Sequence, residues 1–379
     1  MAGMKKIFVL ASFAESLSNF RGKLLAALAE AGVEVHAAAP DLSVDATTTR
    51  ALTRLGSRCH DVPLTRTGLS PLQDSGTLFA LVRLLRQVRP THFFCYTIKP
   101  LIYGTLAAWL VGVPQRTALI TGLGYAFNAE ARGLHSMLQR LLRLMYKVAL
   151  SRATRVVFQN PDDLALFIQL GLVEQDKTAL VSGSGISLDE FCQQPLPSVV
   201  QCHFLLIARL LRDKGIYEYI EAARLVKARY PHAVFHMVGW IDSNPSAIRE
   251  NDLKSWIAEG LIHFHGRLDD VRERLSASHV YVLPSYREGT PRTVLEAMAT
   301  GRAVVTTDAP GCRETVVNGD NGFLVPVADV EALATAMAHF LDDPKLIARM
   351  GQRGREIAEE KYDVNKVNAQ MLKYMGVVA

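Results

Sequence analysis

The chain alternates short apolar runs with helical patterns, and it does so in two successive series. The first run, residues 7–13, precedes a helical pattern that ends at Gly32, and Val33 opens the next run. Further apolar runs follow at 92–98, 116–121 and 155–160. Strand–helix–strand units of this kind build parallel sheets covered by helices, so the pattern predicts an α/β fold.

The alternation breaks at QQPLPSVVQ, residues 193–201, and then begins again. Apolar runs at 203–209, 234–239, 279–285 and 303–308 form the second series. A chain of 379 residues is longer than one hydrophobic core usually grows. We therefore expect two α/β domains, an N-terminal one over 1–195 and a C-terminal one over 196–361.

Two cations follow the first strand of the second series. Arg209 closes the apolar run, and Lys214 lies in the segment LLRDKG before a helix that we expect to open at Ile216. Side-chain charge, free backbone N–H groups and the helix dipole together favour an anion at such a place. The alternative is a pair of solvated surface charges. Because ligands of α/β sheets bind at the carboxyl ends of strands, the anion site is the preferred interpretation.

Two glutamates, Glu288 and Glu296, lie in the segment SYREGTPRTVLEAMATG. Pro291 suits the first turn of a helix and Thr290 its N-cap, while Gly289 lets a ligand approach the backbone. Carboxylates so placed can accept hydrogen bonds from sugar hydroxyls, with a diphosphate at the helix N-terminus between them. The spacing alone is weak evidence, but the glycine, proline and helix start around it favour a nucleotide-sugar site.

These motifs resemble those of retaining family 4 glycosyltransferases with the GT-B fold. The similarity covers the second domain, in E-x7-E, ARLLRDKG, PSYREG and TTDAPGCRETVVNGDNGFLV, and more weakly the first. ITGLGYAF and FQNPDDLALFIQLGLV resemble a narrower group that adds N-acetylhexosamine or hexose to sugars on polyprenyl diphosphate. The resemblance implies two Rossmann-like domains whose parallel sheets face each other across a cleft, with the helix over 362–379 packing back on the first domain.

The resemblance also implies roles for single residues. Arg209 and Lys214 would hold the donor diphosphate, with Glu288 at the donor hexose and Glu296 at the ribose. We count Arg209, Lys214 and Glu288 as catalytic. The other residues that we expect at the nucleotide-sugar are Gly239, Arg267, Leu268, Gly289, Thr290, Pro291, Arg292 and Thr293.

Two departures from the family pattern bear on the first domain. ASFAESLSNFRG, after the first strand, has no glycine before Gly22, so Asn19 or Arg21 would act there through side chains. Many relatives carry a histidine where this chain has ITGLGYAF, so no histidine is assigned a catalytic role. On the acceptor side we expect Asn19, Arg21, Gly124 and Tyr125.

Positive charge is concentrated in the first domain. The whole chain carries a net charge of +5, whereas residues 51–155 alone hold 14 basic and 3 acidic residues. The segment 133–155 places Arg140, Arg143 and Lys147 on one helical face beside leucines and methionines. This is typical of a helix on an anionic membrane surface, or of a core helix with a solvated stripe. No nucleic-acid-binding module accompanies the patch, so we expect no nucleic-acid partner.

The remaining signals narrow the class of protein. The five cysteines form no C-x-x-C, and the N-terminal apolar run is followed by a helix pattern, which favours a cytoplasmic protein. No apolar stretch reaches the roughly 20 residues of a membrane span. The chain has no D-x-D, no dinucleotide fingerprint and no P-loop, so we expect no metal site and no cofactor.

Together these features predict a transferase that moves a sugar from a UDP-sugar to a saccharide on polyprenyl diphosphate. The resemblance implies an N-acetylhexosamine such as N-acetylgalactosamine as the sugar. It implies bacterial O-antigen, lipopolysaccharide, capsule or protein-glycan assembly as the setting, at the inner face of the cytoplasmic membrane. The rivals are a transferase acting on a phospholipid or soluble acceptor, and a catalytically silent nucleotide-sugar-binding subunit. The resemblance further implies that the acceptor attacks on the face that the diphosphate leaves, with the leaving phosphate taking the acceptor proton. The cation pair would stabilise the charge on that phosphate.

Overall fold

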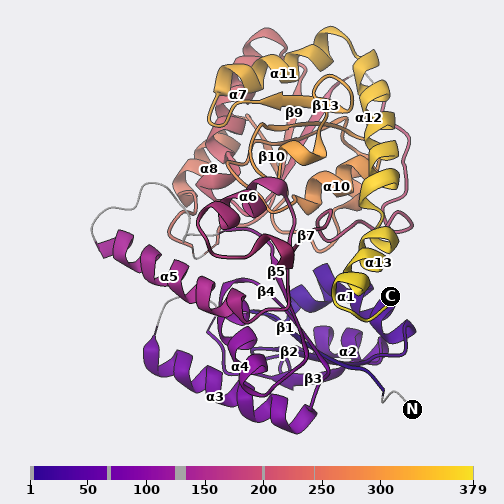
Figure 1. The fold of residues 1–379 in the computed structure, drawn as a ribbon. Helices are drawn as coiled ribbons and strands as arrows, with labels where there is room; N and C mark the ends of the chain where they lie inside the picture. The colour runs from indigo at the N-terminus through magenta and orange to yellow at the C-terminus, as the bar shows by residue number, and fades with distance from the viewer. Residues whose placement is uncertain (1–3, 66–69, 124–133, 199–200, 243, 379) are drawn as a thin grey trace. The chain divides into compact units, whose positions relative to one another are not determined.

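The computed structural model describes residues 4–65, 70–123, 134–198, 201–242 and 244–378, and it divides into two compact units. The first unit holds Met1–Ser184 and Asn365–Ala379, and the second holds Gly185–Val364 (Figure 1). The second unit therefore starts ahead of the proline-bearing segment at 193–201. Its two ends pair with each other, because the Ile186 N–H donates to the Tyr362 carbonyl at 2.8 Å.

A parallel sheet forms the centre of the first unit, and its seven described strands have the order β3-β2-β1-β4-β5-β6-β7. They are β1 Lys6–Leu10, β2 Glu34–Ala39, β3 Arg58–Asp61, β4 His92–Tyr96, β5 Gln115–Ile120, β6 Arg155–Phe158 and β7 Thr178–Leu180. The central strands β1 and β4 are almost wholly buried, as expected of strands that helices cover on both faces. The strand order reverses between β1 and β4.

Helices cover both faces of this sheet (Figure 1). One face packs against α3, α4, α5 and α6, and the other against α1, α2 and the C-terminal α13. Their bounds are α1 Glu15–Glu30, α2 Ala46–Arg54, α3 Pro71–Val88, α4 Thr105–Leu110, α5 Leu134–Ser151, α6 Pro161–Gln169 and α13 Val364–Tyr374. Side-chain caps fix two helix starts: Asp45 accepts from the Thr48 N–H at 3.0 Å, and Asn160 from that of Asp163 at 2.8 Å.

The second unit is built on a parallel sheet whose six described strands have the order β10-β9-β8-β11-β12-β13. They are β8 His203–Ile207, β9 Val234–Val238, β10 His263–Phe264, β11 Val280–Leu283, β12 Ala303–Thr307 and β13 Gly322–Val325. One face packs against α7, α8 and α11, and the other against α9 and α10. The helices are α7 Ile216–Arg229, α8 Glu250–Ala258, α9 Arg272–Ser276, α10 Arg292–Ala299, α11 Val330–Asp342 and α12 Lys345–Ile357. Among the described helices of both units, none has the length and hydropathy that crossing a membrane requires.

The central strands β8 and β11 bring their exit loops into contact. Gly215, in the β8 exit, has a φ of 68°, and a Cβ there would lie 2.1 Å from the Pro284 carbonyl oxygen. Only glycine fits such an approach. The Tyr286 N–H donates to the Asp213 carbonyl at 2.8 Å, which joins the two loops. Because the strand order reverses between β8 and β11, these loops lie where open α/β sheets bind ligands.

Candidate active site

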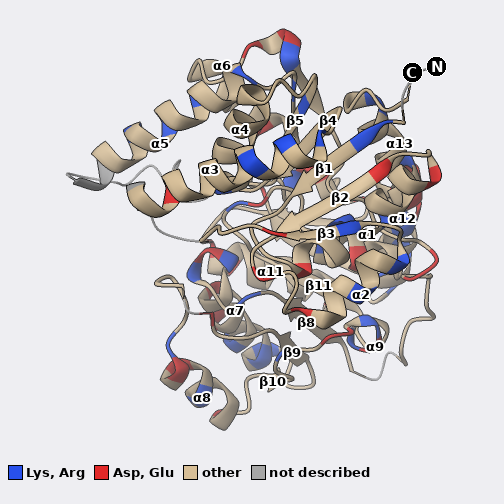
Figure 2. Ribbon diagram, turned by 90° about the horizontal axis from the view of Figure 1, so that it is seen from below, with Lys and Arg blue, Asp and Glu red and all other residues tan. Residues whose placement is uncertain are grey.

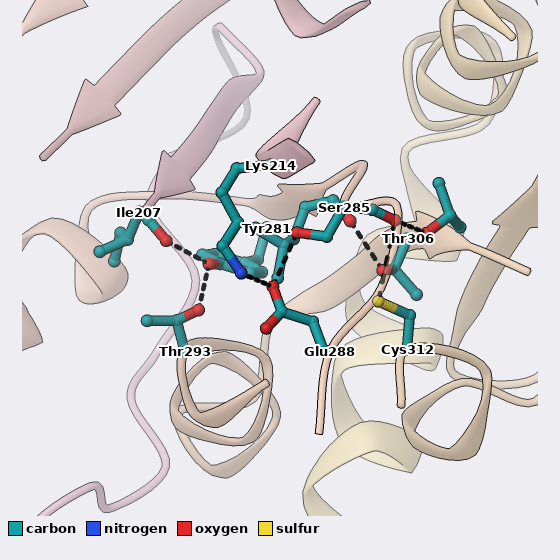
Figure 3. Close-up of polar contacts among 10 residues, drawn as sticks. Ile207, Lys214, Tyr281, Ser285, Glu288, Thr293, Thr306 and Cys312 are labelled. Atoms are coloured by element: carbon teal, nitrogen blue, oxygen red, sulfur yellow. Dashed lines mark hydrogen bonds and ion pairs between the residues drawn. The ribbon is translucent and has the colours of Figure 1, made fainter. Parts of the chain in front are cut away.

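A lysine, a glutamate and a serine from the β8 and β11 exits meet at one point (Figure 3). Nζ of Lys214 lies 2.5 Å from Oε1 of Glu288, and the Ser285 hydroxyl donates to the same oxygen at 2.8 Å. The Lys214 and Glu288 side chains expose only 15% and 17% of their surface, so water screens the pair incompletely. The structure thus brings together two of the residues that the sequence assigns to the site.

The loop that follows β12 holds the backbone of Glu288. The Glu288 N–H donates to the Pro310 carbonyl at 2.9 Å. Gly311 has a φ of 82°, and a Cβ there would lie 2.1 Å from the Glu288 carbonyl oxygen. The Cys312 thiol is buried 4.0 Å from the Ser285 carbonyl, and burial raises its pKa to about 12, so it stays protonated. Sequence analysis missed this support, because the contact between the two loops exists only in three dimensions.

A buried tyrosine links the β8 exit to α10. The Tyr281 hydroxyl donates to the Ile207 carbonyl at 3.0 Å and lies 2.6 Å from the Thr293 hydroxyl (Figure 3). Burial raises the pKa of Tyr281 far above its ordinary value, so the phenol remains a neutral donor. Thr293, which the sequence assigns to donor binding, is thereby tied to the strand exit that precedes Lys214.

Arg209 points to a carboxylate that the sequence did not single out. Its Nη1 lies 2.9 Å from Oδ2 of Asp242, in the segment after β9. That segment is joined to the β8 exit through its backbone, since the Arg212 N–H donates to the Ser246 carbonyl at 2.9 Å. Arg209 and Lys214 follow the same strand, as predicted, but each contacts its own carboxylate.

Helix α10 begins one residue later than the sequence indicated. Pro291 occupies the N-cap position and Arg292 the first helical position, so the assignment of Thr290 as N-cap is wrong. The backbone at Pro291 is extended, with φ −73° and ψ 107°, which keeps this residue outside the helix. Gly289, two residues before Pro291, is buried.

Glu296 lies on a buried side of α10. The Nε of Arg292, one turn earlier, donates to its Oε1 at 3.0 Å. Burial raises the pKa of the Glu296 carboxyl above its ordinary value of 4.5, although the Arg292 guanidinium acts in the opposite direction. A carboxylate accepts several hydrogen bonds, so Glu296 can bind a diol while it remains paired.

The exits of β9 and β10 carry three more of the residues assigned to the donor. A Cβ on Gly239 would lie 2.0 Å from the Ala208 carbonyl oxygen, so the β8 and β9 exits approach each other too closely for a larger residue. The Arg267 guanidinium lies over the Trp240 ring, 4.9 Å from its centroid. Leu268 packs against the core beneath α9 and α10.

Of the residues assigned to the acceptor, the structure describes Asn19 and Arg21, both on α1 of the first unit. Arg21, on α1, is buried, and its guanidinium lies 4.9 Å from the centroid of the Tyr96 ring at the end of β4. Asn19, on the same helix, is exposed. Gly124 and Tyr125 lie outside the described residues. Because the strand order reverses beside β4, Arg21 is at the ligand-binding edge of this sheet.

The segment assigned to the membrane is helix α5. Arg140 and Lys147 are exposed, whereas Arg143 is half-buried. The basic stripe that the sequence predicts is therefore exposed at its two ends and partly covered in the middle.

The arrangement in the second unit suits stabilisation of a leaving diphosphate. Arg209 and Lys214 lie on one strand exit, directly before the N-terminus of α7, whose dipole favours negative charge. A diphosphate carries more charge than a single carboxylate, so it can compete with Asp242 and Glu288 for these cations. Carboxylates beside such a position can accept hydrogen bonds from sugar hydroxyls.

Known protein families match both halves of the chain. The profile described as glycosyl transferases group 1 matches residues 199–357, and that of a glycosyl transferase 4-like domain matches residues 19–183. The N,N'-diacetylbacillosaminyl-diphospho-undecaprenol alpha-1,3-N-acetylgalactosaminyltransferase of Campylobacter jejuni is 29% identical over 97% of each chain. The UDP-Gal:alpha-D-GlcNAc-diphosphoundecaprenol alpha-1,3-galactosyltransferase of Escherichia coli is 26% identical over 76% of each chain.

A solved structure shares the fold. HepE of Anabaena, in complex with UDP and glucose, is similar with a TM-score of 0.75 and 18% identity, over 99% of this chain and 100% of HepE. The two parallel α/β sheets are those of the GT-B fold. Arg209, Lys214 and Glu288 all lie within the group 1 match. The chain is therefore a group 1 glycosyltransferase, a member of the retaining family 4 with the GT-B fold.

Proposed function

We propose that this glycosyltransferase transfers a sugar from a UDP-sugar to a saccharide carried on polyprenyl diphosphate. The observation that carries the proposal is the cluster of Lys214, Glu288 and Ser285 where the strand order of the second sheet reverses. The two relatives named above support the acceptor class, because each is named for a diphospho-undecaprenol-linked sugar. HepE, solved with UDP, supports the donor class.

Lys214 and Arg209 supply the charge that a departing nucleoside diphosphate needs. As the bond between the sugar and the diphosphate lengthens, negative charge grows on the leaving oxygen, and the two cations stabilise it. One such contact contributes about 2–4 kcal/mol to the stability of the transition state. The N-terminus of α7 adds to this stabilisation, because its dipole points the same way.

The two glutamates bind hydroxyl groups and form no covalent bond to the sugar. Glu288, oriented by Ser285 and Lys214, accepts from the donor sugar. Glu296, paired with Arg292, accepts from the ribose. The acceptor hydroxyl attacks on the face that the diphosphate leaves: its oxygen bonds to the anomeric carbon, the bond to the phosphate breaks, and its proton passes to the leaving phosphate. The anomeric configuration is thereby retained.

The donor sugar proposed first is N-acetylgalactosamine, since the Campylobacter jejuni relative is named for its transfer. The product then belongs to bacterial surface-glycan assembly, such as O-antigen or lipopolysaccharide, or to protein-glycan assembly. A polyprenyl-diphosphate acceptor stays in the membrane, so the enzyme acts as a peripheral protein at the inner face of the cytoplasmic membrane.

UDP release, measured across a panel of UDP-sugars with and without a polyprenyl-diphosphate-linked saccharide, tests this proposal. We expect release to depend on both substrates and to be fastest with UDP-N-acetylgalactosamine. Release that a phospholipid or a soluble sugar supports equally well would instead favour one of those acceptors. No release with any donor, from a protein that binds UDP, would indicate a nucleotide-sugar-binding subunit.

A further inference from the structure

The outward face of α5 is apolar. Its solvent-facing side chains form one row along the helix, and 67%, 49%, 57% and 45% of their surfaces are exposed for Met137, Leu141, Leu144 and Val148, respectively. The spacing of four, three and four residues places all of them on one side of a helix. A helix that packs on a core normally turns polar side chains to solvent, so this row is expected to meet a partner.

The fold does not account for the row, because a different face of α5 forms the core. The side chains that pack against the sheet are Leu142, Tyr146, Ala149 and Leu150. At 3.6 residues per turn these buried side chains lie on the opposite side of the helix from the exposed row. Helix α5 therefore has two apolar faces. The inner face stabilises the first unit, and the outer face is available for binding.

Basic side chains lie along one edge of the row and just beyond the end of the helix. Arg140 and Lys147 are exposed along one edge. Arg152, directly after the helix, lies with its guanidinium 4.3 Å from the centroid of the Trp109 ring, and Trp109 is itself an exposed residue of α4. The sequence of α5 contains no aspartate or glutamate, and Figure 2 shows blue but no red on its ribbon.

We propose that α5 lies in the surface of an anionic bilayer, with the row of apolar side chains inserted among the lipids. An interfacial helix has this construction: apolar side chains enter the boundary of the acyl region, and long basic side chains reach the headgroup phosphates. Arg140, Lys147 and Arg152 are placed for those phosphates, and Trp109 is of the residue type that favours this depth.

A second copy of the chain fits the row less well than lipid does. Two copies related by a twofold axis would bring the same patch of each together. The exposed cations of both copies would then gather at one interface, with no acidic side chain on α5 to compensate. Anionic lipid satisfies the apolar row and the charges at once. The proposed function gives this surface its purpose, which is to bring the enzyme to a lipid-linked acceptor, but binding to lipid is measured without donor or acceptor.

Vesicle co-sedimentation of the full-length protein tests the proposal, with vesicles of phosphatidylcholine alone and with added phosphatidylglycerol. Binding should require the anionic lipid. The variant Leu141→Ser/Leu144→Ser should bind about tenfold more weakly at low and high salt, because less apolar surface is buried. The variant Arg140→Gln/Lys147→Gln should bind about tenfold more weakly at low salt only, since salt screens the charges.

A matched control removes two exposed cations from α2, on the other face of the same sheet. Arg50→Gln/Arg54→Gln should bind vesicles as the wild type does. All variants should keep the wild-type affinity for UDP, so loss of membrane binding is distinguishable from loss of the active site. Equal vesicle binding by the wild type and both α5 variants would overturn the proposal. So would a wild-type dimer that Leu141→Ser/Leu144→Ser converts to monomer with no change in vesicle binding.

Discussion

The ammonium of Lys214 and the carboxylate of Glu288 lie 2.5 Å apart, one at the exit of β8 and the other at the exit of β11. We assign the first to the diphosphate and the second to the sugar of the donor. Recognition of the two parts is therefore coupled, because each side chain orients the other. Residues in direct contact show non-additive effects when both are changed.

Lys214→Ala should lower kcat/KM by about 30-fold to 1,000-fold, which corresponds to roughly 2–4 kcal/mol of transition-state stabilisation. Glu288→Gln should also lower it, and the double variant should lose less than the sum of the two free energies. Steady-state kinetics of UDP release gives the three values. Lys254→Ala, which removes a lysine paired with Glu250 at 2.8 Å on the surface of α8, is the control and should be neutral. Full additivity would show that the pair does not act as a unit.

Asp242 should act as a positioning residue for Arg209. Its carboxylate contacts Nη1 of that guanidinium at 2.9 Å, which leaves further N–H groups for a phosphate. Asp242→Ala should lower kcat/KM about tenfold, the cost of a lost charge-assisted hydrogen bond, whereas Asp242→Asn should restore part of the activity. Asp320→Asn is a matched control, because Asp320 pairs with Arg353 at the same 2.9 Å. If Asp242→Ala only lowers the melting temperature and leaves kinetics unchanged, the residue is purely structural.

The carboxyl group of Glu296 should make donor binding depend on pH. Burial raises the pKa of its carboxyl above 4.5, so protonation begins at a higher pH than for an exposed glutamate. The carboxylate is the form that accepts from the ribose hydroxyls, so KM for the UDP-sugar should rise as the pH falls through this raised pKa. Glu296→Gln should have a KM about tenfold higher at neutral pH and no such acid limb. An acid limb that persists in Glu296→Gln would assign it to another group, and Glu331→Gln on α11 is the control.

Histidines on the sheet of the second unit form a hydrogen-bonded stack. Nδ1 of His203 lies 2.9 Å from Nε2 of His236, whose Nδ1 lies 3.0 Å from Nε2 of His265. Burial, followed by the charge of His203, lowers the pKa of His236 from 6.5 to about 3 and that of His279 to about 4. The unfolded chain therefore takes up protons near pH 6.5 while the folded chain does not. The stability that these neutral histidines contribute is complete above pH 6.5. It is lost as the pH falls toward their pKa values in the folded chain.

His236→Gln should make this loss shallower. One titrating histidine lowers the free energy of unfolding by at most about 1.4 kcal/mol for each pH unit below 6.5. Because His236 is partly accessible to solvent, we expect its contribution to be about 1 kcal/mol per pH unit. Chemical unfolding at a series of pH values below 6.5 gives the free energy directly. His232→Gln, at an exposed position, should leave the pH dependence unchanged. A wild-type stability that does not change over this range would contradict the assignment.

Much of the second unit could be predicted because parallel sheets bind ligands at strand ends. Lys214 and Glu288 are polar residues that follow two of the apolar runs, and the structure brings them together. Asp242 was missed, because its contact with Arg209 depends on how the β8 and β9 exits fold against each other. The start of α10 was misplaced by one residue, since a proline fits both the N-cap and the first turn.

Helix α5 shows a different limit of sequence reasoning. Its periodicity predicts an amphipathic helix, but leucines and methionines occupy two of its faces. Leu142 packs inside and Leu141, the preceding residue, faces out. Periodicity cannot tell which apolar face meets the core, because that depends on the elements packed around the helix. The exposed row therefore became visible only in the structure.

Transfer itself is measured most directly by mass spectrometry of the lipid-linked product. Wild type and Lys214→Ala would each be incubated with UDP-N-acetylgalactosamine and a polyprenyl-diphosphate-linked saccharide. We predict that the wild type adds one N-acetylhexosamine with the anomeric configuration of the donor, and that Lys214→Ala forms product at least about 30-fold more slowly. An acceptor whose mass is unchanged with every UDP-sugar, or equal product from the two proteins, would contradict the function and the site proposed for this chain.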